Sequence, residues 1–65
     1  MRVKEITIFF SESSSLFKKY NGNKRFEEVE VEITEDMIII KESSKYPLLF
    51  PRSEVEDYER EEEDE

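Results

Sequence analysis

The stretch Glu28-Val29-Glu30-Val31-Glu32-Ile33 decides the fold, because acidic and apolar residues alternate through it without interruption. Successive side chains of a β-strand point to opposite faces, so this alternation predicts a strand with one buried face and one solvated, acidic face. Phe26 is out of phase with Val29 by one residue. This offset predicts a β-bulge near Glu27–Glu28.

Further strands are predicted on both sides of this one. Asn21-Gly22-Asn23 holds the only glycine and is a strong turn signal, so we expect a hairpin in which Leu16–Tyr20 pairs with Lys24–Thr34. The other expected strands and turns are Val3–Phe10, a turn at Glu35–Asp36, Met37–Glu42, a turn at Ser43–Lys45 and Tyr46–Phe50.

The C-terminal segment has two interpretations. Ser53-Glu54-Val55-Glu56 fits a capping box after Pro51, which predicts a helical turn beginning at Ser53. A final short strand through Val55–Tyr58 is the alternative. The fold class is therefore mostly β, a small antiparallel meander or five-stranded barrel-like sheet of four to five strands. We expect one domain over residues 1–58 and a disordered acidic tail over residues 59–65.

Charge is distributed unevenly along the chain, whose net charge is −8. Residues 54–65 hold nine acidic residues and one arginine, whereas residues 1–53 hold nine residues of each sign. The chain has no cysteine and no histidine. It therefore lacks disulfides, thiolate metal ligands and the commonest general base, so we expect no enzyme, no cofactor and no metal site.

The N-terminus and the apolar runs bear on location. Charge begins at Arg2 and Lys4, too early for a secretory signal, and the longest apolar run is the four residues Met37–Ile40. A membrane span needs roughly 20 residues, so we expect a cytoplasmic protein with no membrane partner. The absence of Gln, Ala and Trp beside abundant Glu, Lys and Ile suits a thermophilic archaeal or viral source. A viral protein would act in the host cytoplasm.

Three runs place large apolar residues on both faces of a strand, namely Ile8–Phe10, Met37–Ile40 and Leu48–Phe50. A sheet with one wet face would alternate throughout, so the second face requires a cover. The Val55–Tyr58 segment, a second subunit or a partner could provide it.

These features favour a non-enzymatic binding module that acts through protein–protein contact, as an adaptor, regulator or inhibitor, with self-association as a further option. Phe9, Ile39 and Leu49 are the predicted contact residues. The acidic end would steer the module to a partner with a basic surface. Steering is assigned to the segment Glu54–Glu65, and its predicted contact residues are Glu54, Glu56, Asp57 and Glu59.

Two alternatives remain open. Basic residues interleaved with aromatic residues can bind single-stranded nucleic acid, and the residues around the expected hairpin tip have this pattern. They are Lys18, Lys19, Lys24 and Arg25 with Phe17 and Tyr20. Ion pairing with neighbouring glutamates is the simpler explanation of those charges. A DNA-mimic inhibitor is the other alternative, since Glu28, Glu30 and Glu32 would repeat every 6.6–7 Å or so along a strand.

Overall fold

The computed structural model describes residues 1–43 and 45–62. Its strands form one antiparallel sheet in the order β4-β3-β2-β1-β5, which confirms the mostly β prediction. The sheet does not close into a barrel, because β4 and β5 are its two edges. The elements are β1 (Arg2–Phe10), α1 (Ser15–Tyr20), β2 (Asn23–Ile33), β3 (Met37–Lys41), β4 (Leu48–Pro51), the 3-10 turn η1 (Arg52–Glu54) and β5 (Val55–Glu62).

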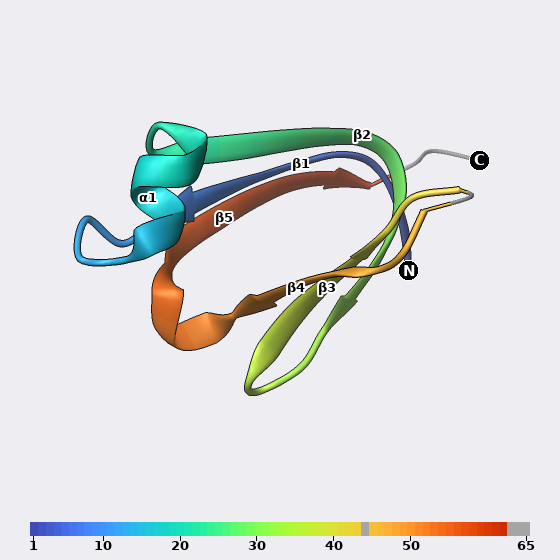
Figure 1. The fold of residues 1–65 in the computed structure, drawn as a ribbon. Helices are drawn as coiled ribbons and strands as arrows, with labels where there is room; N and C mark the ends of the chain where they lie inside the picture. Colours follow the sequence, from blue (N-terminus) through green and yellow to red (C-terminus); the bar gives the residue numbers. More distant parts are fainter. Residues whose placement is uncertain (44, 63–65) are drawn as a thin grey trace.

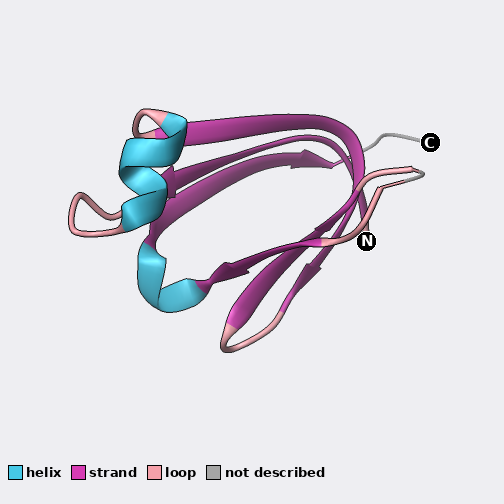
Figure 2. Ribbon diagram, viewed as in Figure 1, coloured by secondary structure: helices cyan, strands magenta, loops and turns pink. Residues whose placement is uncertain are grey.

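Strand β2 bends and joins two layers of the sheet (Figure 1). One layer contains β5, β1 and the first part of β2, and the other contains the end of β2 with β3 and β4. Both α1 and η1 lie at the same end of the molecule (Figure 2). The apolar core fills the space between the layers and consists of Val3, Ile6, Ile8, Phe10, Phe26, Val29, Val31, Ile38, Ile40 and Phe50.

The bend coincides with a switch of faces in two neighbouring strands. Phe26 and Val29 of β2 are both buried although an odd spacing of three separates them, and their partners on β1, Ile6 and Val3, show the same spacing. Glu28 lies at the switch with φ 54°, in the left-handed region. The backbone is irregular where the β-bulge was predicted near Glu27–Glu28, but it is not a bulge, because no extra residue is inserted opposite β1. The β1–β2 register nevertheless stays constant, because both strands switch at the same level.

The hairpin expected between Leu16–Tyr20 and Lys24–Thr34 is wrong, because the first of these segments is the helix α1. The buried Ser14 caps the helix, its hydroxyl accepting a hydrogen bond from the Leu16 N–H at 3.0 Å. Asn21, at φ 56°, ends the helix in the left-handed conformation, and the Gly22 N–H donates to the Phe17 carbonyl at 2.9 Å. The Asn-Gly pair is thus a helix C-cap rather than a hairpin turn.

The C-terminal segment follows the alternative interpretation. The helical turn expected from Ser53 is limited to η1, and a strand replaces it from Val55 onward. Val55 and Tyr58 pack against the core, so they do not cover the outer face of the sheet. The boundary expected after residue 58 does not fall there either. Strand β5 pairs with β1 through Glu62, while residues 63–65 of the expected tail lie outside the described residues.

The face switch at Glu28 predicts a contrast between two glycine substitutions. The left-handed conformation costs an L-residue about 1–2 kcal/mol, which glycine does not incur. We expect Glu28→Gly to exceed Glu27→Gly in stability by about this amount in urea unfolding. The two glutamates are matched controls, since both are exposed and each has one ion pair at 3.8 Å. Equal stability of the two variants would contradict a strained backbone at residue 28.

Candidate functional site

The outer face of β3 and β4 carries an apolar patch. Ile39 and Leu49 are direct cross-strand partners, and Met37 and Pro51 form the next pair on the same face. Leu49 is 55% exposed, and the other three side chains are half-buried. We call these four residues the β3–β4 patch. The sequence pattern predicted Ile39 and Leu49 as contact residues. It missed Met37 and Pro51, which only the β3–β4 register places beside them.

Phe9, the third predicted contact residue, lies elsewhere. It pairs with Asn23 at the start of β2, whereas Ile39 pairs with Glu32 near its end. These two β2 positions are nine residues apart, or about 30 Å along the strand. The structure therefore brings Ile39 and Leu49 together and separates both from Phe9.

The free edge of β4 offers few hydrogen-bond donors. The Arg52 N–H donates to the Asp36 carbonyl at 2.8 Å, so the backbone groups of Arg52, Phe50 and Leu48 face β3. The intervening residues Leu49 and Pro51 face away from the sheet, and Pro51 has no N–H. Pro47, directly before the strand at the next odd-numbered position, also has none. Such placement of proline is typical of edge strands that do not accept a further strand.

The predicted steering residues are gathered around the beginning of β5. Asp57 and Glu59 oppose Phe9 and Thr7 on the outer face, and Glu56 is the extra residue of a bulge between the Phe9 and Phe10 pairs. Phe9 lines a shallow, open hollow with these three acids. Glu54 precedes them in η1. Within residues 1–43 and 45–62, none of the four acids forms an ion pair.

The acidic row of β2 is largely neutralised by neighbouring cations. Glu28 lies 3.8 Å from Arg2, and Glu32 lies 3.9 Å from Lys41. Glu30 lies 3.5 Å from the N-terminal ammonium group. The left-handed backbone at Glu28 also bends the row. A ligand that needs evenly spaced, uncompensated negative charges would not find them here.

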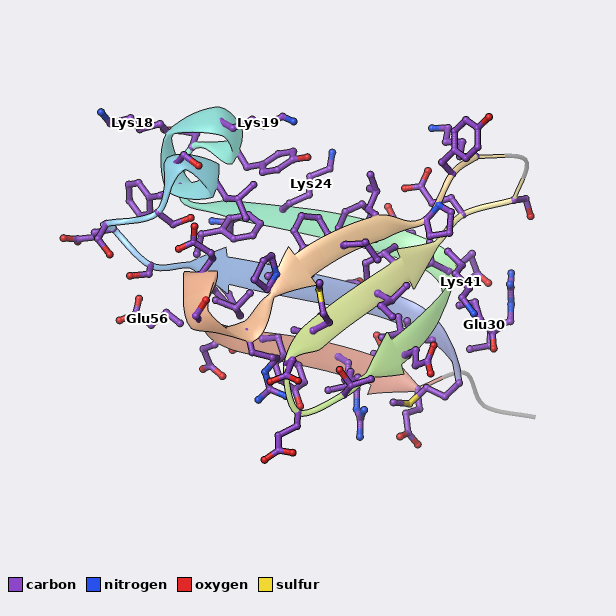
Figure 3. All side chains as sticks on the ribbon, turned by 60° about the horizontal axis from the view of Figure 1, so that its bottom comes forward. Lys18, Lys19, Lys24, Glu30, Lys41 and Glu56 are labelled. Carbon is purple, nitrogen blue, oxygen red and sulfur yellow. The ribbon has the colours of Figure 1, made fainter. Side chains whose placement is uncertain are left out.

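The predicted basic residues divide into two groups. Lys18, Lys19 and Lys24 gather around α1 and the start of β2, at the opposite end from Lys41 (Figure 3). Arg25 instead donates a 2.7 Å hydrogen bond to Glu5, which is the main cause of its raised guanidinium pKa. In the described part of the chain, the three lysines have no carboxylate within ion-pair distance. Ion pairing with neighbouring glutamates therefore accounts for Arg25 alone.

The aromatic residues at this end face inward. Tyr20 stacks on Phe10 with ring centroids 5.4 Å apart. The rings of Tyr20 and Phe50 meet edge to face, with centroids 6.2 Å apart. Phe17 is half-buried and also packs against the core. Base stacking needs an aromatic face that is open to solvent. The structure therefore provides the cations of the predicted nucleic-acid surface, but its aromatic rings belong mainly to the core.

The described residues contain neither a cluster of metal-binding side chains nor a membrane-spanning helix. No group of three or more metal-binding side chains occurs in residues 1–43 and 45–62. Nor does this part of the chain contain a helix with the length and apolar character needed to cross a membrane. Comparison with family models, curated proteins and solved structures finds no match to this chain.

The inward packing of Tyr20 predicts a structural role for this residue. We expect Tyr20→Ala to lower the free energy of unfolding by about 2–3 kcal/mol, because it removes ring contacts to Phe10 and Phe50. Tyr46 is the matched control, since its side chain is 93% exposed. Tyr46→Ala should change stability by less than about 0.5 kcal/mol in the same urea titration. Similar losses in the two variants would show that Tyr20 is not a core residue.

Proposed function

We propose that this chain is a non-enzymatic binding module that contacts a protein partner through the β3–β4 patch. The supporting observation is the Ile39–Leu49 pair on the outer face. Their neighbours Ile38, Ile40 and Phe50 already fill the core, so folding does not require apolar side chains at positions 39 and 49. Apolar surface that folding does not use, gathered in one place, is typical of a contact site.

The size of the patch favours a modest affinity. Four side chains, three of them half-buried, expose far less surface than a stable interface of about 800 Å² per partner requires. A weak or transient contact, or one extended by further residues, fits this area. The acids at the start of β5 do not enlarge this surface, because Asp57 and Glu59 lie beside Phe9 and Thr7 on the outer face of the other layer (Figure 1).

A basic surface on the partner fits the acids at the start of β5. Glu54, Glu56, Asp57 and Glu59 form no ion pair within the described residues, so their charge is available to a partner. Charges at the rim of an interface mainly raise the association rate and make it dependent on salt. The DNA-mimic alternative has less support, because the acids of β2 are paired with cations.

Photo-crosslinking tests the contact role of the patch. A benzoylphenylalanine at position 49 should give a discrete crosslinked product in the organism that encodes the chain. Excess unmodified protein should compete with this crosslink, whereas an Ile39→Ser, Leu49→Ser variant should not compete. Both substituted positions lie outside the core, so the variant should keep its thermal midpoint.

Position 12 provides the control, because Glu12 is exposed on the loop before α1. Equal crosslinking from positions 12 and 49 would contradict a specific patch. A crosslink between two copies, supported by sedimentation velocity, would assign the patch to self-association and would refute the proposed contact with a different protein.

Steering by the acids makes a separate prediction, which can be measured on the partner that crosslinking identifies. We expect Glu56→Gln, Asp57→Asn and Glu59→Gln together to lower the association rate about tenfold at low salt and to flatten its salt dependence. The substitutions leave strand β5 intact, whereas deletion of residues 59–65 would remove part of it. Stopped-flow measurement would refute steering if the rate and its salt dependence were unchanged.

A further inference from the structure

The first part of β2 has a free edge of its own. Strand β2 pairs with β1 from Asn23 to Glu30, but it pairs with β3 only from Glu30 to Ile33. No described strand therefore pairs with Asn23–Glu27 on the side away from β1. The side chains of Asn23, Arg25 and Glu27 are exposed.

The hydrogen bonds at the two ends of β2 show which backbone groups this edge presents. The Phe10 N–H donates to the Gly22 carbonyl at 2.9 Å, so even-numbered residues at the start of β2 face β1. The Val31 N–H donates to the Met1 carbonyl at 2.7 Å, so odd-numbered residues face β1 after the bend. The residues of β2 that face β1 therefore change from even-numbered to odd-numbered at Glu28. Before it, the N–H and C=O groups of the odd-numbered residues point away from the sheet.

This edge differs from the free edge of β4. On β4, Pro47 and Pro51 remove two of the outward N–H groups. On β2, the outward residues are Asn23, Arg25 and Glu27, and each of them has both a donor and an acceptor. A partner strand could therefore form an alternating ladder with the β2 edge, up to the bend at Glu28.

The charges beside the β2 edge favour an acidic partner. Lys24 lies at the start of the edge, and Lys18 and Lys19 lie on α1 just before it (Figure 3). Lys19 sits 5.4 Å from the Tyr20 ring centroid and Lys24 sits 5.6 Å from that of Phe26, so cation–π contacts hold both ammonium groups near the protein surface. Most other cations of the described chain are paired with acids, including Arg2, Lys4, Arg25, Lys41, Lys45 and Arg60.

We propose that the free edge Asn23–Glu27 is a docking site for an extended acidic peptide, which adds to β2 as an antiparallel or parallel strand. Backbone hydrogen bonds to the edge would provide the geometry, and Lys18, Lys19 and Lys24 would select for carboxylate side chains. The unpaired acids Asp57 and Glu59 lie across β1 from the edge, about 10 Å or two strand spacings away. This is one Debye length at 0.1 M salt, so their repulsion is weakened there, whereas the lysines lie beside the edge itself.

An acidic strand fits these observations better than a nucleic acid does. The lysines would attract either ligand, but the rings that bases would stack on pack against the core. A strand uses the outward N–H groups of the edge, for which a single-stranded nucleic acid has no matching ladder. The site is independent of the β3–β4 patch, so it extends the proposed function rather than resting on it.

Fluorescence anisotropy with the full chain tests the proposal. The probe is a fluorescein-labelled peptide of alternating glutamate and valine, seven residues long, in 0.1 M salt. Lys19→Glu with Lys24→Glu should weaken binding at least tenfold, because both cations beside the edge are reversed. Lys41→Glu with Lys45→Glu makes the same charge change away from α1 and should alter binding less than threefold. Circular dichroism confirms that each variant is folded.

Two further measurements distinguish strand addition from charge attraction alone. N-methylation of alternate peptide residues removes ladder donors without changing charge, and it should weaken binding at least tenfold. Amide hydrogen exchange should slow at Asn23, Arg25 and Glu27 when the unmodified peptide binds. Absence of binding, unchanged exchange at these amides, or binding of a thymidine 20-mer in place of the peptide would each overturn the proposal.

Discussion

The shared face switch of β1 and β2 is the constraint on which the rest of the structure depends. A regular pair of strands would carry Val3 and Val29 to the opposite side of the sheet from Ile6 and Phe26. Irregular backbone at Glu28 of β2 and a register shift at Lys4 of β1 keep all four in the core, where they are buried. The irregularity at Glu28 also changes which backbone groups of β2 face outward. The bend, the pairing with β3 and the free edge Asn23–Glu27 therefore share one origin.

The fold places some charged side chains in ion pairs and leaves others unpaired. Cross-strand pairs on the sheet join opposite charges, as between Lys41 and Glu32 or between Arg25 and Glu5. Each such exposed pair contributes little to stability, but it removes both charges from the field that a partner meets. The remaining positive charge lies around α1, and much of the remaining negative charge lies at the start of β5. Both sets lie at the same end of the molecule, because η1 leads into β5 at the end where α1 lies (Figure 2).

Local pattern predicted the strands well and the connections poorly. Alternation from Glu28 to Ile33 identified β2, because it depends only on which residues are buried. Leu16 and Tyr20 are one helical turn apart, and Asn21-Gly22 suits both a hairpin turn and a helix C-cap, so only the tertiary contacts of Tyr20 decide between them. Like-charge repulsion suggested a tail from residue 59, yet on a strand the acids alternate between faces and Lys4 lies beside Glu61. The position of Phe9 relative to Ile39 could not be predicted, because it depends on the register of three paired strands.

The two prolines of the β4 edge determine how a partner can use the apolar residues beside them. With Pro47 and Pro51 in outward positions, Leu49 provides the one outward N–H of that edge, so another chain gains little by continuing the ladder there. A partner of the β3–β4 patch must then approach from the face and be selected by side-chain shape. Strand β4 can thus keep leucines in water without its own edge becoming a template for open-ended fibril growth.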